Sequence, residues 1–134
     1  MVAWGTGCRR RWVHNSARPE ARVMALVGDG SAAYTPQALW TAAREGLQIK
    51  VVILNNGGYG ILKSFNERFF SYLGHSLGLD VPGLDLATLA RSMGVEAARV
   101  SEPESLDAEL ERAFASEGPY LLDVRLDTVT PEVF

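Results

Sequence analysis

A single aspartate stands between two glycines where a short apolar run ends. Residues 23–27 are all apolar, and Gly28, Asp29 and Gly30 follow them directly. A second polar turn, with the sequence NNGG at residues 55–58, follows the next apolar run at residues 51–54. The two turns therefore occupy the same position relative to two successive apolar segments, which makes them candidates for one site.

The residue types of these turns suit a cation together with phosphate groups. Asp29 offers an anionic oxygen, Asn56 offers an amide oxygen, and glycines leave backbone carbonyls accessible. Hard divalent cations prefer such oxygen ligands, and the N–H groups of Gly30 and Ser31 can bind phosphates. Each turn alone is equally a tight turn of the kind that glycine and asparagine form. At the ends of successive strands, however, the pair predicts a metal–diphosphate clamp.

The elements that must position the turns alternate between strand and helix patterns. Apolar runs predict strands at residues 23–27, 51–54, 95–100 and 120–126. Helices are predicted to begin near residues 35, 60, 85 and 101, and residues 66–83 are predicted to form a long loop. This alternation predicts an α/β fold, a parallel sheet flanked by helices. In such sheets, ligands bind beyond the carboxyl ends of the strands, where both turns fall.

Length and composition indicate one ordinary globular domain. The chain has 134 residues, 47% of them hydrophobic, and a net charge of -3, which gives no reason to expect nucleic acid as a partner. One cysteine excludes an internal disulfide framework. No apolar run reaches the length of a membrane-spanning helix, and no secretory signal is evident, so a cytoplasmic protein is expected.

The spacing of the two turns matches a known fingerprint. The motif GDG, then 24 residues, then NN is similar to the signature of thiamine diphosphate-dependent enzymes. The segment GDGSAAYTPQALWTAAREGLQIKVVILNNGGYGILKSF closely resembles the C-terminal, diphosphate-binding domain of the benzoylformate decarboxylase family. The resemblance covers residues 19–126 and implies a truncated form of the thiamine diphosphate-binding fold.

The resemblance implies roles for individual residues. Asp29 and Asn56 correspond to side-chain ligands of Mg²⁺, and Gly58 to a backbone carbonyl ligand. Thiamine diphosphate itself would be bound by these residues together with Gly28, Gly30, Ser31 and Tyr59. No catalytic residue of the family has a counterpart here, because the activating glutamate and the histidines belong to a separate pyrimidine-binding domain.

Other side chains near the turns receive weaker interpretations. Ile61 and Phe65 correspond to the apolar lining of the family's substrate pocket, although packing in the core explains them equally well. Tyr34 and Trp40 are expected to lie in the core. His75 is expected to be a solvated surface residue.

Three readings of function stay open. The chain is interpreted as the cofactor-binding domain of a 2-oxo acid decarboxylase that needs a pyrimidine-binding domain in trans, and an oligomer is expected if it functions. The alternatives are an inactive gene fragment that at most binds the cofactor, and an acetolactate-synthase-like carboligase domain.

The two ends of the chain differ from the rest. Residues 1–18 are basic and lack an apolar period, and residues 127–134 are predicted to be a tail. One GC-rich coding of residues 7–13, read in a shifted frame, gives L-P-A-A-V-G, which resembles a helix of the family. Residues up to about Ser16 are therefore interpreted as a possible out-of-frame remnant.

Overall fold

The computed structural model describes residues 23–70 and 78–127, and these residues build one parallel sheet. The four strands lie in the order β1-β2-β4-β3, with every neighbouring pair parallel. Their bounds are Val23–Gly28 for β1, Ile49–Asn55 for β2, Glu96–Val100 for β3 and Tyr120–Arg125 for β4. The predicted α/β class and all four predicted strands are confirmed, with ends that differ by one or two residues.

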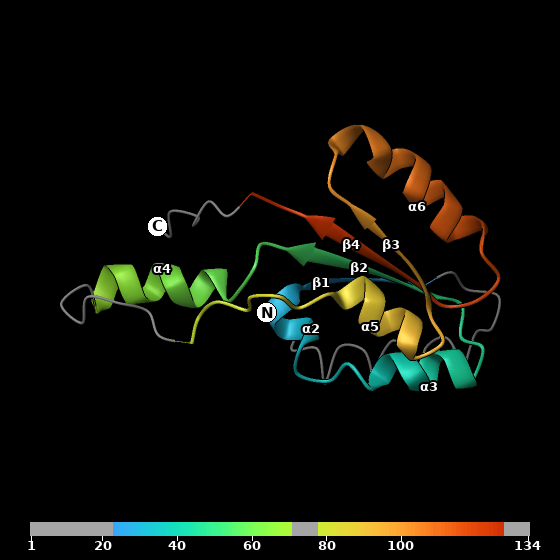
Figure 1. The fold of residues 1–134 in the computed structure, drawn as a ribbon, viewed down its shortest axis with the longest axis horizontal. Coiled ribbons are helices and arrows are strands. Elements are labelled where there is room, and N and C mark those ends of the chain that lie inside the picture. The colour runs from blue at the N-terminus through green and yellow to red at the C-terminus, as the bar shows by residue number, and fades with distance from the viewer. Residues whose placement is uncertain (1–22, 71–77, 128–134) are drawn as a thin grey trace.

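Helices lie on both faces of this sheet (Figure 1). The helices α3 (Ala38–Arg44) and α5 (Leu86–Ser92) lie on one face, and α6 (Leu106–Ala115) lies on the other. Strand β2 is buried along almost its whole length because it is covered on both sides, which explains the apolar run at residues 51–54.

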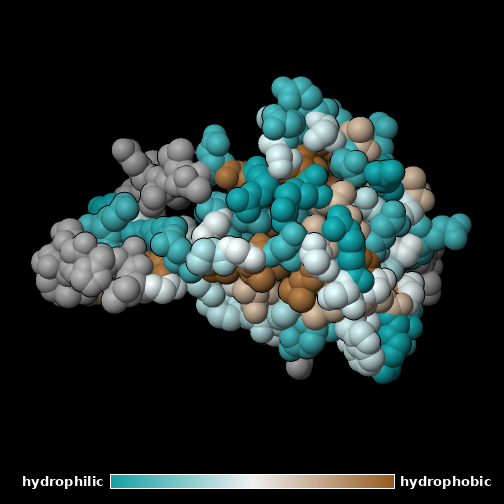
Figure 2. Space-filling view, viewed as in Figure 1, coloured by the Kyte–Doolittle hydropathy of each residue, from teal (hydrophilic) through white to brown (hydrophobic). Residues whose placement is uncertain are grey.

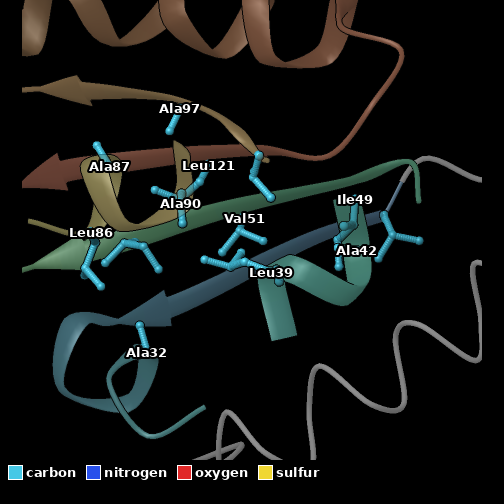
Figure 3. Close-up of a cluster of buried hydrophobic side chains, with 14 residues drawn as sticks. Ala32, Leu39, Ala42, Ile49, Val51, Leu86, Ala87, Ala90, Ala97 and Leu121 are labelled. Carbon is cyan, nitrogen blue, oxygen red and sulfur yellow. The ribbon is translucent and has the colours of Figure 1, made fainter. Parts of the chain in front are cut away.

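The larger core cluster lies between the sheet and the pair α3 and α5 (Figure 3). Leu39 and Ala42 of α3 and Leu86 and Ala90 of α5 belong to this cluster, together with side chains from all four strands. The smaller cluster lies under α6 and includes the fully buried side chains of Tyr120 and Leu122. In the space-filling view hydrophilic residues cover the outer side of α6 (Figure 2). No helix in the described part of the chain has the length and apolar character that crossing a membrane requires.

Two further helices follow the carboxyl ends of β1 and β2. The short helix α2 (Asp29–Ala32) begins directly after β1, and α4 (Gly60–Phe69) begins shortly after β2 and extends away from the sheet (Figure 1). The sequence predicted only the start of α4 and assigned residues 66–83 to a loop. That loop prediction is wrong for residues 66–69, which continue the helix.

The predicted helix starts have mixed outcomes. The helix predicted to begin near residue 85 is α5, and Asp85 caps it, because its side chain accepts a hydrogen bond from the Thr88 N–H at 2.8 Å. The helix predicted to begin near residue 101 starts later than predicted. A short 3₁₀ turn (Pro103–Ser105) comes first, and α6 starts only at Leu106. Proline favours the first position of a helical turn, which explains the shifted start.

The expectation that Tyr34 and Trp40 lie in the core is also wrong. Tyr34 is 66% exposed and Trp40 is 52% exposed. Helix α3 turns Leu39 and Ala42 toward the sheet, so Trp40 falls outside the buried face. His75, residues 1–18 and nearly all of the tail at 127–134 lie outside the described residues.

Candidate functional site

Asp29 lies where β1 ends and α2 begins. Gly28 is the register partner of Leu54, so the two predicted turns leave the sheet from adjacent strands. Gly28 is still extended, with φ -75° and ψ 152°, and Asp29 is the first residue of α2. The Asp29 side chain is only 3% exposed. A buried carboxylate needs partners that compensate for lost hydration, and the second turn supplies one.

The Asn56 side chain meets both Asp29 and the Gly58 carbonyl. With its amide nitrogen toward them, Asn56 donates to Asp29 Oδ1 at 3.0 Å and to Gly58 O at 2.9 Å. Rotating this amide by 180° would bring a third oxygen to the same point. The structure thus brings together the three residues predicted as cation ligands. In the described part of the chain, no group of three or more His, Cys, Asp or Glu side chains could hold a metal ion.

Glycines shape the second turn. Gly57 has a φ of +80°, a conformation that residues with a side chain rarely adopt. Gly58 is buried and pairs with Asp80 in an isolated antiparallel bridge, flanked by hydrogen bonds from Tyr59 N to Leu79 O (2.9 Å) and from Val81 N to Gly57 O (3.0 Å). A Cβ on Gly58 would collide with the Leu79 carbonyl oxygen. The close approach of a second chain segment therefore fixes the position of the Gly58 carbonyl.

Tyr59 connects the two turns from one side. Its ring lies against Gly30, and its centroid is 6.0 Å from that of Tyr34. The side-chain hydrogen bond with Tyr34 is the main cause that raises the pKa of Tyr59 above its ordinary 10.0, and the Asp29 charge adds to the rise. The raised pKa keeps the Tyr59 phenol protonated, so it can donate a hydrogen bond beside Asp29. Ser31 lies on α2 next to Gly30 and is partly buried.

Ile61 and Phe65 lie on α4, with exposed fractions of 43% and 45%. Packing in the core is therefore excluded as the reason for these two apolar residues in this structure. Phe65 stacks on Phe69 with ring centroids 5.7 Å apart, and Leu62 is also exposed. The structure thus presents an apolar surface on α4 next to the paired turns.

Sequence reasoning missed two residues behind the site. Asn55 was part of the predicted turn without a role of its own, and Asp123 was read only as part of a strand. Their side chains are hydrogen bonded at 2.7 Å, and both are buried. The signal was present, since Asp123 interrupts the apolar strand sequence YLLDVR with a charge.

Comparisons with known proteins agree with this geometry. The family model "Thiamine pyrophosphate enzyme, C-terminal TPP binding domain" matches residues 1–124. Benzoylformate decarboxylase of Pseudomonas aeruginosa is 40% identical over 115 residues, which are 86% of this chain and 21% of that protein. The mitochondrial acetolactate synthase catalytic subunit of Saccharomyces cerevisiae is 34% identical over 116 residues, which are 86% of this chain and 16% of that protein.

A solved structure is similar over the same region. The thiamine diphosphate-dependent 4-hydroxybenzoylformate decarboxylase of Rhodococcus jostii RHA1 superposes with a TM-score of 0.79 and 38% identity. The match covers 87% of this chain and 22% of that one. The chain thus spans about a fifth of the length of these relatives. The fold, the paired turns and the match over residues 1–124 lead to one conclusion: the chain belongs to the thiamine pyrophosphate enzyme family, as its C-terminal TPP-binding domain.

Proposed function

We propose that this chain binds thiamine diphosphate through a Mg²⁺ ion held by Asp29, Asn56 and Gly58. The ligands would be the Asp29 carboxylate, the Asn56 amide oxygen and the Gly58 carbonyl. Gly28, Gly30, Ser31 and Tyr59 would surround the diphosphate. The N–H groups of Gly30 and Ser31 would bind its oxygens, and the Tyr59 hydroxyl would donate to it.

The distances around Asn56 carry this proposal. In an octahedral Mg²⁺ site with metal–oxygen distances of about 2.0–2.1 Å, neighbouring ligand oxygens are about 2.9 Å apart. The end of the Asn56 side chain lies 3.0 Å from Asp29 Oδ1 and 2.9 Å from Gly58 O. A rotation of the amide alone would therefore place the Asn56 oxygen at the spacing of adjacent octahedral ligands from Asp29 Oδ1 and from Gly58 O.

This chain's own residues anchor and orient the cofactor. Asp29 would hold the Mg²⁺, whose positive charge would offset that of the diphosphate, while Gly30 lets the Tyr59 ring approach the backbone. Thiamine diphosphate, when bound, supplies an electron sink for a substrate carbanion. The residues that activate it are expected on a pyrimidine-binding domain, which a partner chain would supply.

Binding of the cofactor is tested by calorimetry with thiamine diphosphate and Mg²⁺ on the whole chain. Asp29→Ala and the equal-sized Asp29→Asn should each abolish Mg²⁺-dependent binding while leaving the circular dichroism spectrum unchanged. Asp107→Ala, an exposed acidic residue on α6, serves as the matched control and should bind like the parent. An unchanged affinity in both Asp29 variants would refute the ligand assignment.

The proposed activity is decarboxylation of a 2-oxo acid of the benzoylformate type, in complex with the pyrimidine-binding domain. The isolated chain should not decarboxylate benzoylformate, and turnover by the homogeneous chain would contradict this. The similarity to acetolactate synthase supports a second candidate, a carboligase. Product analysis of the reconstituted complex separates the two, because only the carboligase joins two 2-oxo acid-derived fragments. A third candidate, an inactive gene fragment, predicts no turnover with any partner domain.

A further inference from the structure

Asp123 is a buried carboxylate behind the cation site. It lies on β4 and is 0% exposed. Its Oδ1 accepts a hydrogen bond from Asn55 Nδ2 at 2.7 Å, and its Oδ2 accepts one from Arg99 Nε at 3.1 Å. Arg99 is its direct register partner on β3. Burying a charge without such partners costs several kcal/mol, so both donors are needed to keep the carboxylate in place.

The Asn55 side chain connects Asp123 to the second turn through two hydrogen bonds. While its Nδ2 donates to Asp123, its Oδ1 accepts the Gly57 N–H at 3.2 Å. The Asn55 amide therefore has one orientation, since the reverse orientation would face Asp123 with an oxygen. Gly57 is the residue with φ of +80°, and it leads directly to the Gly58 carbonyl.

Arg99 completes the chain of contacts on the other side. Its Nη2 lies 2.8 Å from Asp85 Oδ1, and Asp85 caps α5. The network therefore runs from the start of α5 through the sheet to the second turn. Only a carboxylate at position 123 can accept from Arg99 and from Asn55 at the same time. An amide has one acceptor oxygen and would leave one of these donors facing an N–H group.

We propose that Asp123 is a positioning residue for the cation site, acting through Asn55 on the turn that presents Asn56 and Gly58. The inference rests on the proposed function, because it assigns Asp123 to the same Mg²⁺ site. Asp123 fixes Asn55, and Asn55 holds the Gly57 N–H. The turn is thereby kept in the shape that brings the Asn56 side chain and the Gly58 carbonyl to Asp29.

The test compares Asp123→Asn with Lys50→Met in the full chain. Lys50 lies on β2, the same strand as Asn55, and its Nζ donates to Ser116 O and Gly118 O at 2.8 and 2.6 Å. It sits at the opposite end of that strand, so its loss removes buried hydrogen bonds without touching the turn. Two quantities are measured in each variant: amide exchange of Gly57 by NMR, and Mg²⁺ affinity in the presence of thiamine diphosphate by calorimetry.

Asp123→Asn should speed exchange at Gly57 and weaken Mg²⁺ binding, by at most the roughly 10- to 100-fold that loss of a ligand's own hydrogen-bond partner causes. Lys50→Met should lower the melting temperature but change neither quantity. Parent-like exchange at Gly57 in Asp123→Asn overturns the inference, and so does an equal loss of affinity in Lys50→Met. If the parent chain itself binds no Mg²⁺ with thiamine diphosphate, the proposed function fails instead, and Gly57 exchange still shows whether Asp123 holds the turn.

Discussion

Tyr59 lies across Gly30 so closely that no side chain fits between them. A Cβ built on Gly30 would come within 2.7 Å of Tyr59 Cδ1 and 2.8 Å of Cε1. Glycine at this position therefore has a steric reason, because Gly30 is not among the residues with positive φ. The contact holds the first residues of α2 against the start of α4, so the two turns share one packed boundary.

Gly30→Ala should therefore push the Tyr59 ring away and lower the free energy of unfolding by about 1–3 kcal/mol, the usual cost of overpacking. Gly28→Ala is the matched control for stability, because a Cβ there meets nothing within 4 Å and the backbone is extended. Urea unfolding of both variants measures the difference. Equal stability of the two would contradict the proposed contact.

Asn56→Asp should make the chain's stability depend strongly on Mg²⁺. The new carboxylate would stand about 3 Å from that of Asp29, and two like charges so close disfavour each other's ionisation. Without a cation the melting temperature should fall, and added Mg²⁺ should raise it more than in the parent. Asn66→Asp on α4 is the same substitution away from the site, and NaCl at equal ionic strength controls for screening. A Mg²⁺ response no larger than that of Asn66→Asp would refute the shared site.

Asp85→Asn should reduce the loss of folding stability at acidic pH. The backbone hydrogen bond from Thr88 lowers the pKa of Asp85 below its ordinary 3.8 in the folded chain. A lowered folded pKa gives stability that is fully present above the unfolded value and is lost as pH falls through the folded value. Asparagine caps helices as well but does not titrate. Urea unfolding between about pH 6 and pH 2 should therefore show a smaller loss below pH 3.8 in the variant, and an equally steep acid loss would contradict this.

Phe65→Ser should lower the free energy of unfolding of the isolated chain only slightly. Phe65 is 45% exposed and packs mainly on Phe69, so its removal should change the free energy of unfolding by about 1 kcal/mol or less. Leu121 lies in the larger core cluster and is 1% exposed. Leu121→Ala should therefore lower the free energy of unfolding by about 2–5 kcal/mol. Urea unfolding compares them, and a similar cost for both would mean that α4 packs against the body of the domain.

The sequence predicted the sheet and the pairing of the two turns because these depend on local patterns. Continuous apolar runs identify the parallel strands, although Met24 and Leu26 of β1 are exposed, and the ends of consecutive paired strands lie together. Asp29 and Asn56 were identified in this way. Strand β1 pairs with β2 directly, so no knowledge of the remaining topology was needed to place these residues side by side.

The residues that were missed depend on strand order and on exposed packing. Asp123 meets Asn55 and Arg99 only because β4 lies between β2 and β3, which no local pattern reveals. Tyr34 pairs with Tyr59 across a turn, so its large apolar ring does not imply burial. Residues 66–69 extend α4 because nothing among them breaks a helix, although the glycines further along had favoured a loop prediction.

Strand β4 follows β3 in the chain but lies between β2 and β3 in the sheet. During synthesis, β1 and β2 can pair with each other soon after they emerge, whereas β3 has no neighbour until β4 is made. At typical rates of elongation this interval is roughly one to five seconds. Strand β4 joins the β1–β2 pair to β3, and it also carries Asp123. The nascent chain therefore completes its sheet and gains the support behind its second turn when β4 inserts.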